Sequence, residues 1–255
     1  MAKRKVKYSR LLLLLFLIVL PVFLGISLLF SRNPWDVSHF KEQEGWMVYA
    51  GRGYQSIRGI DVSSHQGVID WKRVKEDGIS FAMIRCGYRG GTEGLQHVDE
   101  RFEQNMEQAI AQGIDVGVYY YCSAITMDEL EEDANLVLQL VKDYDLKYPI
   151  AFDMEIYDES IGRINALTVD EKTQMALAFC DRMEENGYRS MIYGNKSWLK
   201  EHLAFDQIRG HSLWYAGYVE SPTLVEPFDM WQFTNQGSID GIEGSVDLNV
   251  KIEKS

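Results

Sequence analysis

The segment Ile150-Ala151-Phe152-Asp153-Met154-Glu155 shows the pattern that decides the fold, a short apolar run that ends in acidic residues. Short apolar runs bounded by turn residues are typical of buried strands. Similar runs recur along the chain, and we predict a strand at each of them: Ile57–Val62, Phe81–Arg85, Val116–Tyr121, Ile150–Met154, Ser190–Tyr193, Leu213–Tyr218, Met230–Phe233 and Val246–Val250.

The stretches between the early runs have helical patterns, at about residues 71–77, 99–112, 127–144 and 168–187. The last of them begins with a capping box, formed by Thr168 and Glu171. Strands that alternate with helices predict a parallel sheet joined by right-handed crossovers. The final three runs leave no room for full helices between them. We therefore expect an α/β fold in the form of an incomplete, TIM-like (β/α) barrel.

Acidic residues lie at the ends of several predicted strands. Asp61 ends the first run, Asp153 and Glu155 end the fourth, and Asp247 opens the eighth. Barrel enzymes carry their chemistry at the C-terminal ends of the strands, so we expect these four acids to share one site. Asp153 and Glu155 are two positions apart, and on a strand both side chains would therefore point to the same face.

Paired carboxyl groups of this kind are suited to glycoside hydrolysis. Two adjacent carboxyl groups in a confined site cannot both ionise easily, so the pKa of one should be raised. Glycosidases use a protonated acid for the leaving oxygen and an anion beside the developing positive charge. A single acid at a strand end more often caps a helix or pairs with arginine, but four such acids favour a catalytic site.

Aromatic side chains lie on or beside the same strands, and they can pack against the apolar C–H face of a pyranose sugar. Tyr120 and Tyr121 are neighbours on one strand, so at most one of them can lie in a cleft. We expect substrate contacts from Tyr119, Tyr121, Arg85, Tyr193, Trp214, Tyr218 and Trp231.

The charge of the chain is unevenly distributed. The 255 residues include 26 Lys and Arg against 38 Asp and Glu, which gives a formal net charge of −12. Residues 1–32 hold six basic residues and no acid, so the remainder has a net charge of −18. A surface of this sign repels polyphosphate, and nucleic acid is therefore excluded as the partner.

The N-terminal region contains twenty residues without a charge, Leu11 to Phe30. As a helix this segment would span about 30 Å, the thickness of the bilayer hydrocarbon. Five basic residues precede it, which places the N-terminus in the cytoplasm and the remainder outside the cell membrane. The alternative is a cleaved secretory signal, whose apolar region is normally shorter. We expect a tail over residues 1–10, a transmembrane signal-anchor over 11–30, a stalk over 31–56 and a barrel over 57–255.

Three cysteines, Cys86, Cys122 and Cys180, form an odd set within apolar or helical surroundings. We expect buried free thiols rather than a disulfide framework. No CxxC or Cys/His pair indicates a metal site. The sequence predicts neither a metal nor another cofactor.

Several motifs resemble those of family 25 glycoside hydrolases, the lysozymes or N-acetylmuramidases. The resemblance covers about residues 57–252, and the motifs come in the order found in that family. They are Gly59-Ile60-Asp61-Val62-Ser63 with Gln66-Gly67 and Ile69-Asp70-Trp71, Phe81-Ala82-Met83-Ile84-Arg85, the helix with Asp99, Phe102 and Asn105, Gly117-Val118-Tyr119, Asp153-Met154-Glu155, Ile192-Tyr193-Gly194-Asn195, Leu213-Trp214-Tyr215-Ala216, Trp231-Gln232-Phe233-Thr234 and Val246-Asp247-Leu248-Asn249.

This resemblance implies an irregular barrel with about five β/α units and three extra strands. It also implies hydrolysis of the β-1,4 bond between N-acetylmuramic acid and N-acetylglucosamine in peptidoglycan. Glu155 would be the general acid and Asp153 would stabilise charge on the substrate acetamido group, with Asp61 and Asp247 completing an acidic floor. The nucleophile is either an enzyme carboxylate or the substrate's own acetamide, and we favour the acetamide.

Two other readings remain open from the sequence. Four acids at a barrel mouth could hold Ca²⁺ or Mg²⁺ in a metal-dependent phosphodiesterase, although only His65 lies near a strand end to assist. Alternatively, the chain could be a membrane-anchored, non-catalytic module that binds peptidoglycan. The oligomeric state is not indicated by the sequence.

Overall fold

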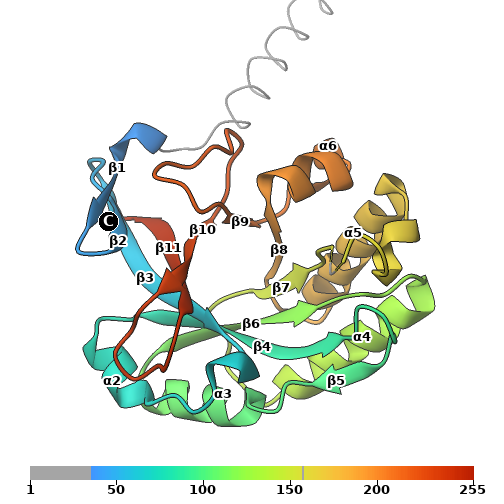
Figure 1. The fold of residues 1–255 in the computed structure, drawn as a ribbon, viewed down its shortest axis with the longest axis horizontal. Coiled ribbons are helices and arrows are strands. Elements are labelled where there is room, and N and C mark those ends of the chain that lie inside the picture. Colours follow the sequence, from blue (N-terminus) through green and yellow to red (C-terminus); the bar gives the residue numbers. More distant parts are fainter. Residues whose placement is uncertain (1–35, 157) are drawn as a thin grey trace, which may run out of the picture.

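Eight strands close into a barrel in the computed structural model, which describes residues 36–156 and 158–255 (Figure 1). The sheet has the order β3-β11-β10-β9-β8-β7-β6-β4, and β3 pairs with β4 to close it. β5 (Gln96–Val98) extends the sheet beyond β4. The barrel strands are β3 (Tyr54–Val62), β4 (Phe81–Arg89), β6 (Asp115–Tyr121), β7 (Ile150–Asp153), β8 (Ser190–Asn195), β9 (Leu213–Ala216), β10 (Met230–Gly237) and β11 (Val246–Lys254).

A helix follows each of the first five barrel strands. These helices are α2 (Trp71–Glu76), α3 (Phe102–Ala111), α4 (Met127–Val141), α5 (Val169–Glu185) and the short α6 (Phe205–Ile208). Short turns of helix are η1 (Val37–His39), η2 (Ser64–Gln66), η3 (Arg163–Ala166) and the π-helical η4 (Trp198–His202). The predicted strands all coincide with barrel strands and the four predicted helices with α2 to α5. The incomplete barrel with five β/α units and three further strands is confirmed.

The last strand runs against its neighbours. β11 pairs antiparallel with both β10 and β3, whereas the other barrel pairings are parallel. Only residues 238–245 connect β10 to β11. A parallel return needs a crossover of a dozen or more residues, so this short connection enforces a hairpin. The start of β11 therefore lies at the same barrel end as the C-terminal ends of the other strands.

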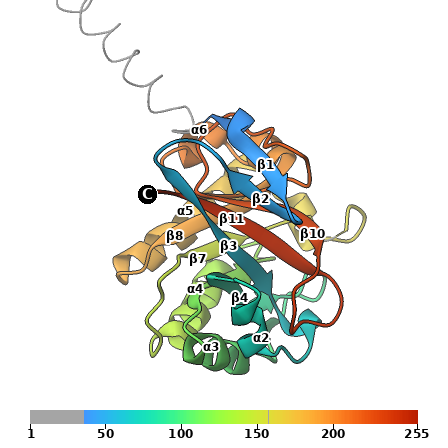
Figure 2. The same cartoon turned by 90° about the vertical axis from the view of Figure 1, so that its left-hand side faces the viewer.

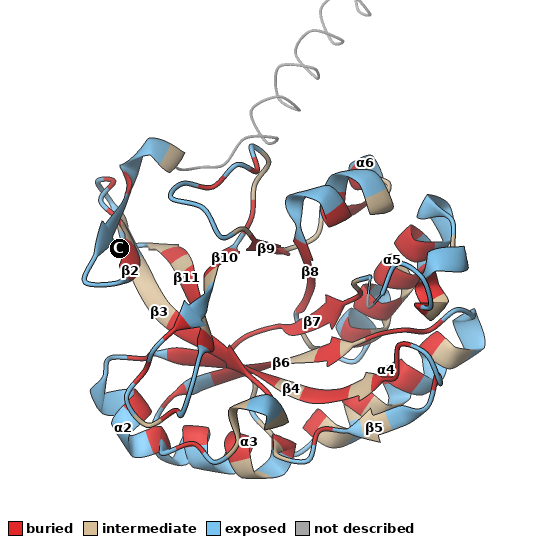
Figure 3. Cartoon of the chain, viewed as in Figure 1, coloured by how far each residue is buried: buried red, intermediate tan, exposed pale blue. Residues whose placement is uncertain are grey.

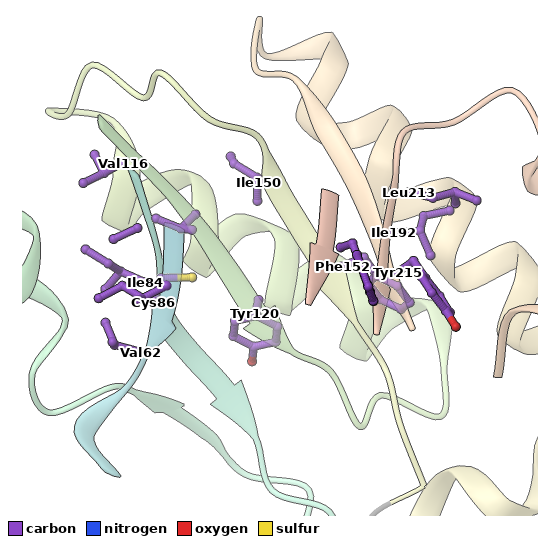
Figure 4. Close-up of a cluster of buried hydrophobic side chains, with 14 of the residues drawn as sticks. Val62, Ile84, Cys86, Val116, Tyr120, Ile150, Phe152, Ile192, Leu213 and Tyr215 are labelled. Atoms are coloured by element: carbon purple, nitrogen blue, oxygen red, sulfur yellow. The ribbon is translucent and has the colours of Figure 1, made fainter. Parts of the chain in front are cut away.

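Alternate residues of each strand face outward or into the barrel. The outward side chains form the main core against the helices, and Figure 4 shows Val62, Ile84, Tyr120, Phe152 and Tyr215 within it. The barrel strands are largely buried, whereas β5 and the outer faces of the helices are exposed (Figure 3). The three cysteines are free and buried, as predicted.

Large apolar side chains fill the half of the barrel interior that lies toward the N-terminal ends of the parallel strands. This second core includes Phe81, Met83, Met191, Trp214 and Met230. The Phe81 ring stacks on Tyr148 with 4.3 Å between centroids, and a Cβ at Gly59 would lie 2.1 Å from that Phe81 ring. Glycine is therefore required where the two strands meet. This apolar floor closes the barrel at the end opposite the C-terminal ends of its parallel strands.

Residues 36–56 differ from the predicted stalk. β1 (Phe40–Gln43) and β2 (Trp46–Tyr49) form an antiparallel hairpin that lies beside β3 and β11 (Figures 1 and 2). Phe40, Trp46 and Tyr49 are buried against the barrel. β10 and β11 have no covering helix, so the hairpin shields their outward apolar side chains from water. This part of the chain belongs to the folded body.

The predicted transmembrane segment, residues 11–30, lies outside the described residues. Among residues 36–156 and 158–255, no helix has the length and apolar character needed to cross a membrane.

Candidate active site

The structure brings the four predicted acids together at the open end of the barrel. Asp61 ends β3, Asp153 ends β7, and Glu155 lies two residues beyond it. Asp247 is the second residue of β11 and is the direct register partner of Asp61. The antiparallel direction of β11 explains why an acid at the start of a strand joins acids at the ends of others.

Asp61 is held in place by two amide side chains. Gln232 Nε2 and Asn249 Nδ2 donate to Asp61 Oδ2 at 2.8 and 2.7 Å. Asn249 Oδ1 in turn accepts from Trp214 Nε1 at 2.7 Å, and Gln232 Oε1 accepts from the hydroxyls of Tyr193 and Tyr218 at 2.9 and 3.0 Å. Because both amide oxygens are engaged, both amide nitrogens must face Asp61.

Gln232 and Asn249 were not predicted as site residues. Both are buried, with 3% and 0% of their surface exposed. The signal that could have found them is strand alternation: Gln232 shares the inward face of β10 with Met230, and Asn249 shares the inward face of β11 with Asp247. A polar side chain on the inward face of a barrel strand, near its open end, lies where substrate binds.

Asp61 and Asp247 form the first pair of carboxyl groups, and the pKa of each is raised. Burial and the charge of Asp247 raise the pKa of Asp61 well above its usual value, against the hydrogen bonds from Gln232 and Asn249. Burial raises the pKa of Asp247 to about 6. Asp61 and Asp247 face each other on neighbouring strands, and two carboxyl groups this close repel each other when both are ionised.

Asp153 and Glu155 form the second pair. Burial, followed by the charges of Glu155 and Asp61, raises the pKa of Asp153 well above its usual value, and the nearby Arg85 opposes this shift. Burial also raises the pKa of Glu155. Asp153 is 6% exposed, and its Oδ1 is buried without a hydrogen-bond partner among the described residues. Both carboxyl groups of this pair therefore hold a proton to higher pH than an ordinary carboxyl group does, and Asp153 keeps one oxygen without a partner.

A cleft of about 540 Å³ opens beside Glu155. Arg85 and Tyr121, two of the residues predicted to contact substrate, line it together with Tyr88 and residues 90–93. Arg85 donates through Nε to Asp99 Oδ2 at 2.8 Å and through Nη2 to Ser64 Oγ at 3.1 Å. These bonds fix a positive charge at the edge of an otherwise acidic site.

Three of the predicted aromatic residues pack on one another inside the barrel. The ring of Trp214 meets Tyr193 at 4.8 Å and Tyr119 at 6.0 Å between centroids, both edge to face. Trp214 is only 1% exposed, so it supports the two tyrosines from below. Tyr218, in contrast, is 51% exposed at the rim.

The prediction of a substrate contact from Trp231 is wrong. Trp231 is fully buried on the outward face of β10, where its ring lies 5.0 Å from that of Phe40. Its Nε1 donates to the carbonyl oxygen of Gly217 at 2.8 Å. Gln232 points into the barrel, so the side chain before it must point out.

Within residues 36–156 and 158–255, no group of three or more His, Cys, Asp or Glu side chains is arranged to hold a metal ion.

The chain is similar to a large set of known proteins. The family model described as glycosyl hydrolases family 25 matches residues 60–242. An autolytic lysozyme of Clostridium acetobutylicum is 26% identical over 194 residues, which cover 76% of this chain and 55% of that protein. An uncharacterised protein of Escherichia coli O157:H7, YegX, is 30% identical over 225 residues, covering 84% of this chain and 77% of that protein.

Solved structures give the same picture. The modular autolysin LytC of Streptococcus pneumoniae, in complex with a synthetic peptidoglycan ligand, has a TM-score of 0.70 at 26% identity, covering 83% of this chain and 51% of that one. A family 25 glycosyl hydrolase from Bacillus anthracis has a TM-score of 0.66 at 24% identity, covering 82% and 94%. This second likeness shows the fold. The chain spans about half the length of the autolytic lysozyme and of LytC.

Proposed function

Because the chain belongs to glycosyl hydrolases family 25, we propose that it is a peptidoglycan hydrolase of the lysozyme type. The bond cleaved is the β-1,4 bond between N-acetylmuramic acid and N-acetylglucosamine. The observation that carries this proposal is the gathering of four carboxyl groups, those of Asp61, Asp153, Glu155 and Asp247, at the open end of the barrel. The names of two relatives, an autolytic lysozyme and an autolysin with a bound peptidoglycan ligand, support the substrate class.

Glu155 acts as the general acid. It borders the open cleft and is less buried than Asp153, so a glycosidic oxygen can reach it. Its raised pKa keeps the proton on the carboxyl group until the leaving oxygen needs it. Asp247 adds to this effect, since its negative charge raises the pKa of Glu155 further.

Asp153 acts on the acetamido group of the substrate. In this role Asp153 accepts the acetamido N–H and stabilises the positive charge that develops as the carbonyl oxygen attacks C1. Asp153 lies two residues from the acid on the same strand end, and not on an opposing strand, which favours the acetamide as nucleophile. Asp61 and Asp247 maintain the negative potential beneath the developing cation.

Residues 11–30 anchor the enzyme to the cell membrane, with the barrel outside. The barrel region is strongly acidic and long-range attraction does not hold it to an anionic wall, so the anchor raises the local concentration of enzyme near its substrate. Wall digestion by cells that express full-length and anchor-deleted forms at equal levels tests this role. Equal digestion by the two forms would contradict it.

Purified peptidoglycan and mass analysis of the products test the activity itself. A muramidase leaves N-acetylmuramic acid at the new reducing ends. Binding of muropeptides with no new reducing ends between pH 4 and 8 would instead identify a non-catalytic module. Loss of activity in a chelator would favour the metal-dependent alternative.

A further inference from the structure

A second cleft opens at the same end of the barrel, across from the first. It has a volume of about 620 Å³ and lies between the β1–β2 hairpin and the end of β10. Its walls include Glu42, Glu44, Trp46, Tyr218 and Phe233. In the strand order, β10 is four strands from β6, which borders the first cleft, so the two clefts lie on opposite sides of the mouth.

The acids join the two clefts. Tyr218 lines the second cleft and donates to Gln232, which donates to Asp61. Glu155 lines the first cleft. Burial and the charges of Asp247, Asp61 and Glu155 raise the pKa of Tyr218. A linear polymer laid across the mouth would thus meet a cleft on each side of the acids.

The hairpin is a rigid wall rather than a flap. Glu44 and Gly45 both have positive φ, at 53° and 80°, as in the tight two-residue turns that match the twist of paired strands. The Trp46 ring lies 5.8 Å from Phe233, and the Arg58 guanidinium lies 5.0 Å above it. A preorganised wall loses little entropy when a ligand binds to it.

The two faces of β1 differ. Glu42 is on the same face as the buried Phe40 but is exposed, because it extends past the core into the second cleft. Lys41 points to the opposite face and does not line the cleft. Neither Glu42 nor Glu44 has an ion-pair partner among the described residues, so both carboxylates are free to accept hydrogen bonds from a ligand.

We propose that the β1–β2 hairpin and Tyr218 form one wall of an extended glycan-binding groove, which holds peptidoglycan sugars beyond those that flank the cleaved bond. The exposed Tyr218 ring supports the apolar face of a sugar, and Glu42 and Glu44 accept bonds from sugar hydroxyls. The hairpin lies before residues 60–242, the part of the chain that the family model matches. The inference rests on the proposed function, because it assumes a glycan substrate.

Two matched substitutions on β1 test the groove in the full-length protein. Glu42→Trp places a bulky side chain in the second cleft, and Lys41→Trp places the same side chain on the other face. The measured quantity is kcat/KM for long glycan strands and for a tetrasaccharide of the same repeat, with Tm as the check on folding. Glu42→Ala serves as a milder variant that removes one charged acceptor.

We expect Glu42→Trp to lower kcat/KM for long strands about tenfold or more, the equivalent of losing one hydrogen bond to a charged group. Activity on the tetrasaccharide should stay within about twofold of the wild type, and Glu42→Ala should show a smaller loss of the same kind. Lys41→Trp should leave both substrates unaffected. An equal rate for Glu42→Trp and wild type on long strands would overturn the groove while leaving the proposed function intact. A wild-type protein that cleaves neither substrate would overturn both.

Discussion

Two regions of this molecule bury acidic side chains, and their surroundings are opposite. At the barrel mouth, Asp61, Asp153, Glu155 and Asp247 crowd together with Arg85 as the nearby cation, and burial raises the pKa of each acid. On the outer side of the barrel, between β4, β6 and α4, Asp133 is completely buried but well supplied with donors. The acids at the mouth are arranged for proton transfer, whereas Asp133 stabilises the fold.

Both carboxylate oxygens of Asp133 accept hydrogen bonds from neighbouring side chains. Arg89 Nε donates to both of its oxygens at 3.0 and 3.1 Å, and Tyr120 and Gln96 donate to Oδ1 at 2.7 and 2.8 Å. Arg89 also bonds Glu132 at 2.9 Å. Asp153, in contrast, keeps a buried oxygen without a partner. Burial alone therefore does not mark a functional acid, since the buried carboxylate of Asp133 is fully paired.

The largest expected effect is on catalysis, from Glu155→Gln. This change removes the proton donor but keeps the shape of the side chain, so kcat on peptidoglycan should fall about 10²–10⁴-fold with no loss in Tm. Glu159→Gln, an exposed change in the same loop, is the matched control and should be silent. Digestion at the wild-type rate by Glu155→Gln would show that Glu155 is not the acid.

Asp133→Ala should have the reverse effect, a loss of stability with little loss of activity. It leaves Arg89 buried without its main partner, which costs about 3–5 kcal/mol in the free energy of unfolding. Activity per folded molecule should stay close to normal. Glu131→Ala removes a surface ion pair on the same helix and should cost less than about 1 kcal/mol in chemical denaturation. If both variants unfold at the same denaturant concentration, the buried pair is not a structural anchor.

A smaller effect is expected at Asp61, which resembles Asp133 because neighbouring side chains donate hydrogen bonds to it. These donors are the amides of Gln232 and Asn249. Gln232→Glu replaces a donor to Asp61 with another acid, so kcat should fall about tenfold. The added negative charge should also raise the pKa of Glu155 and move the alkaline limb of the pH profile to higher pH. Asn235→Asp adds the same charge at an exposed position of β10 and should leave the profile unmoved. A normal kcat with an unshifted profile would rule out a positioning role for Gln232.

The smallest effect concerns stability and pH. The pKa of Asp247 in the folded protein, about 6, lies above its ordinary value of 3.8, so folding disfavours the ionised form. The destabilising contribution of Asp247 is therefore fully present above pH 6 and disappears as the pH falls toward 4. The stability advantage of Asp247→Asn over wild type should grow by about 1–2 kcal/mol between pH 4 and pH 7, after allowance for solvent screening. A pH-independent difference would contradict the raised pKa.

Much of the fold could be predicted because its signals are local. The strands and the helices α2 to α5 follow from apolar runs, capping residues such as Thr168, and the spacing between them. The β1–β2 hairpin could not be predicted in this way. It is stabilised by contacts with Trp231 and Phe233, almost two hundred positions later in the sequence.

The acids of the candidate site were predicted, but the amide side chains that hold Asp61 in place were not. Asp61, Asp153 and Glu155 follow from their positions at strand ends, whereas Asp247 joins them only because β11 turns back. Trp231 was misplaced because residue type was weighed above strand alternation, which puts Gln232 inside. The same alternation, applied to every strand near the mouth, would have identified both amides that hold Asp61.

The central claim is that the acids at the mouth cleave the glycan on the reducing side of N-acetylmuramic acid. Mass analysis of the products from purified peptidoglycan, digested by wild type and by Glu155→Gln, tests it most directly. We predict N-acetylmuramic acid at the new reducing ends with the wild type and almost no new ends with the variant. N-acetylglucosamine at those ends, or equal product from both proteins, would contradict the claim.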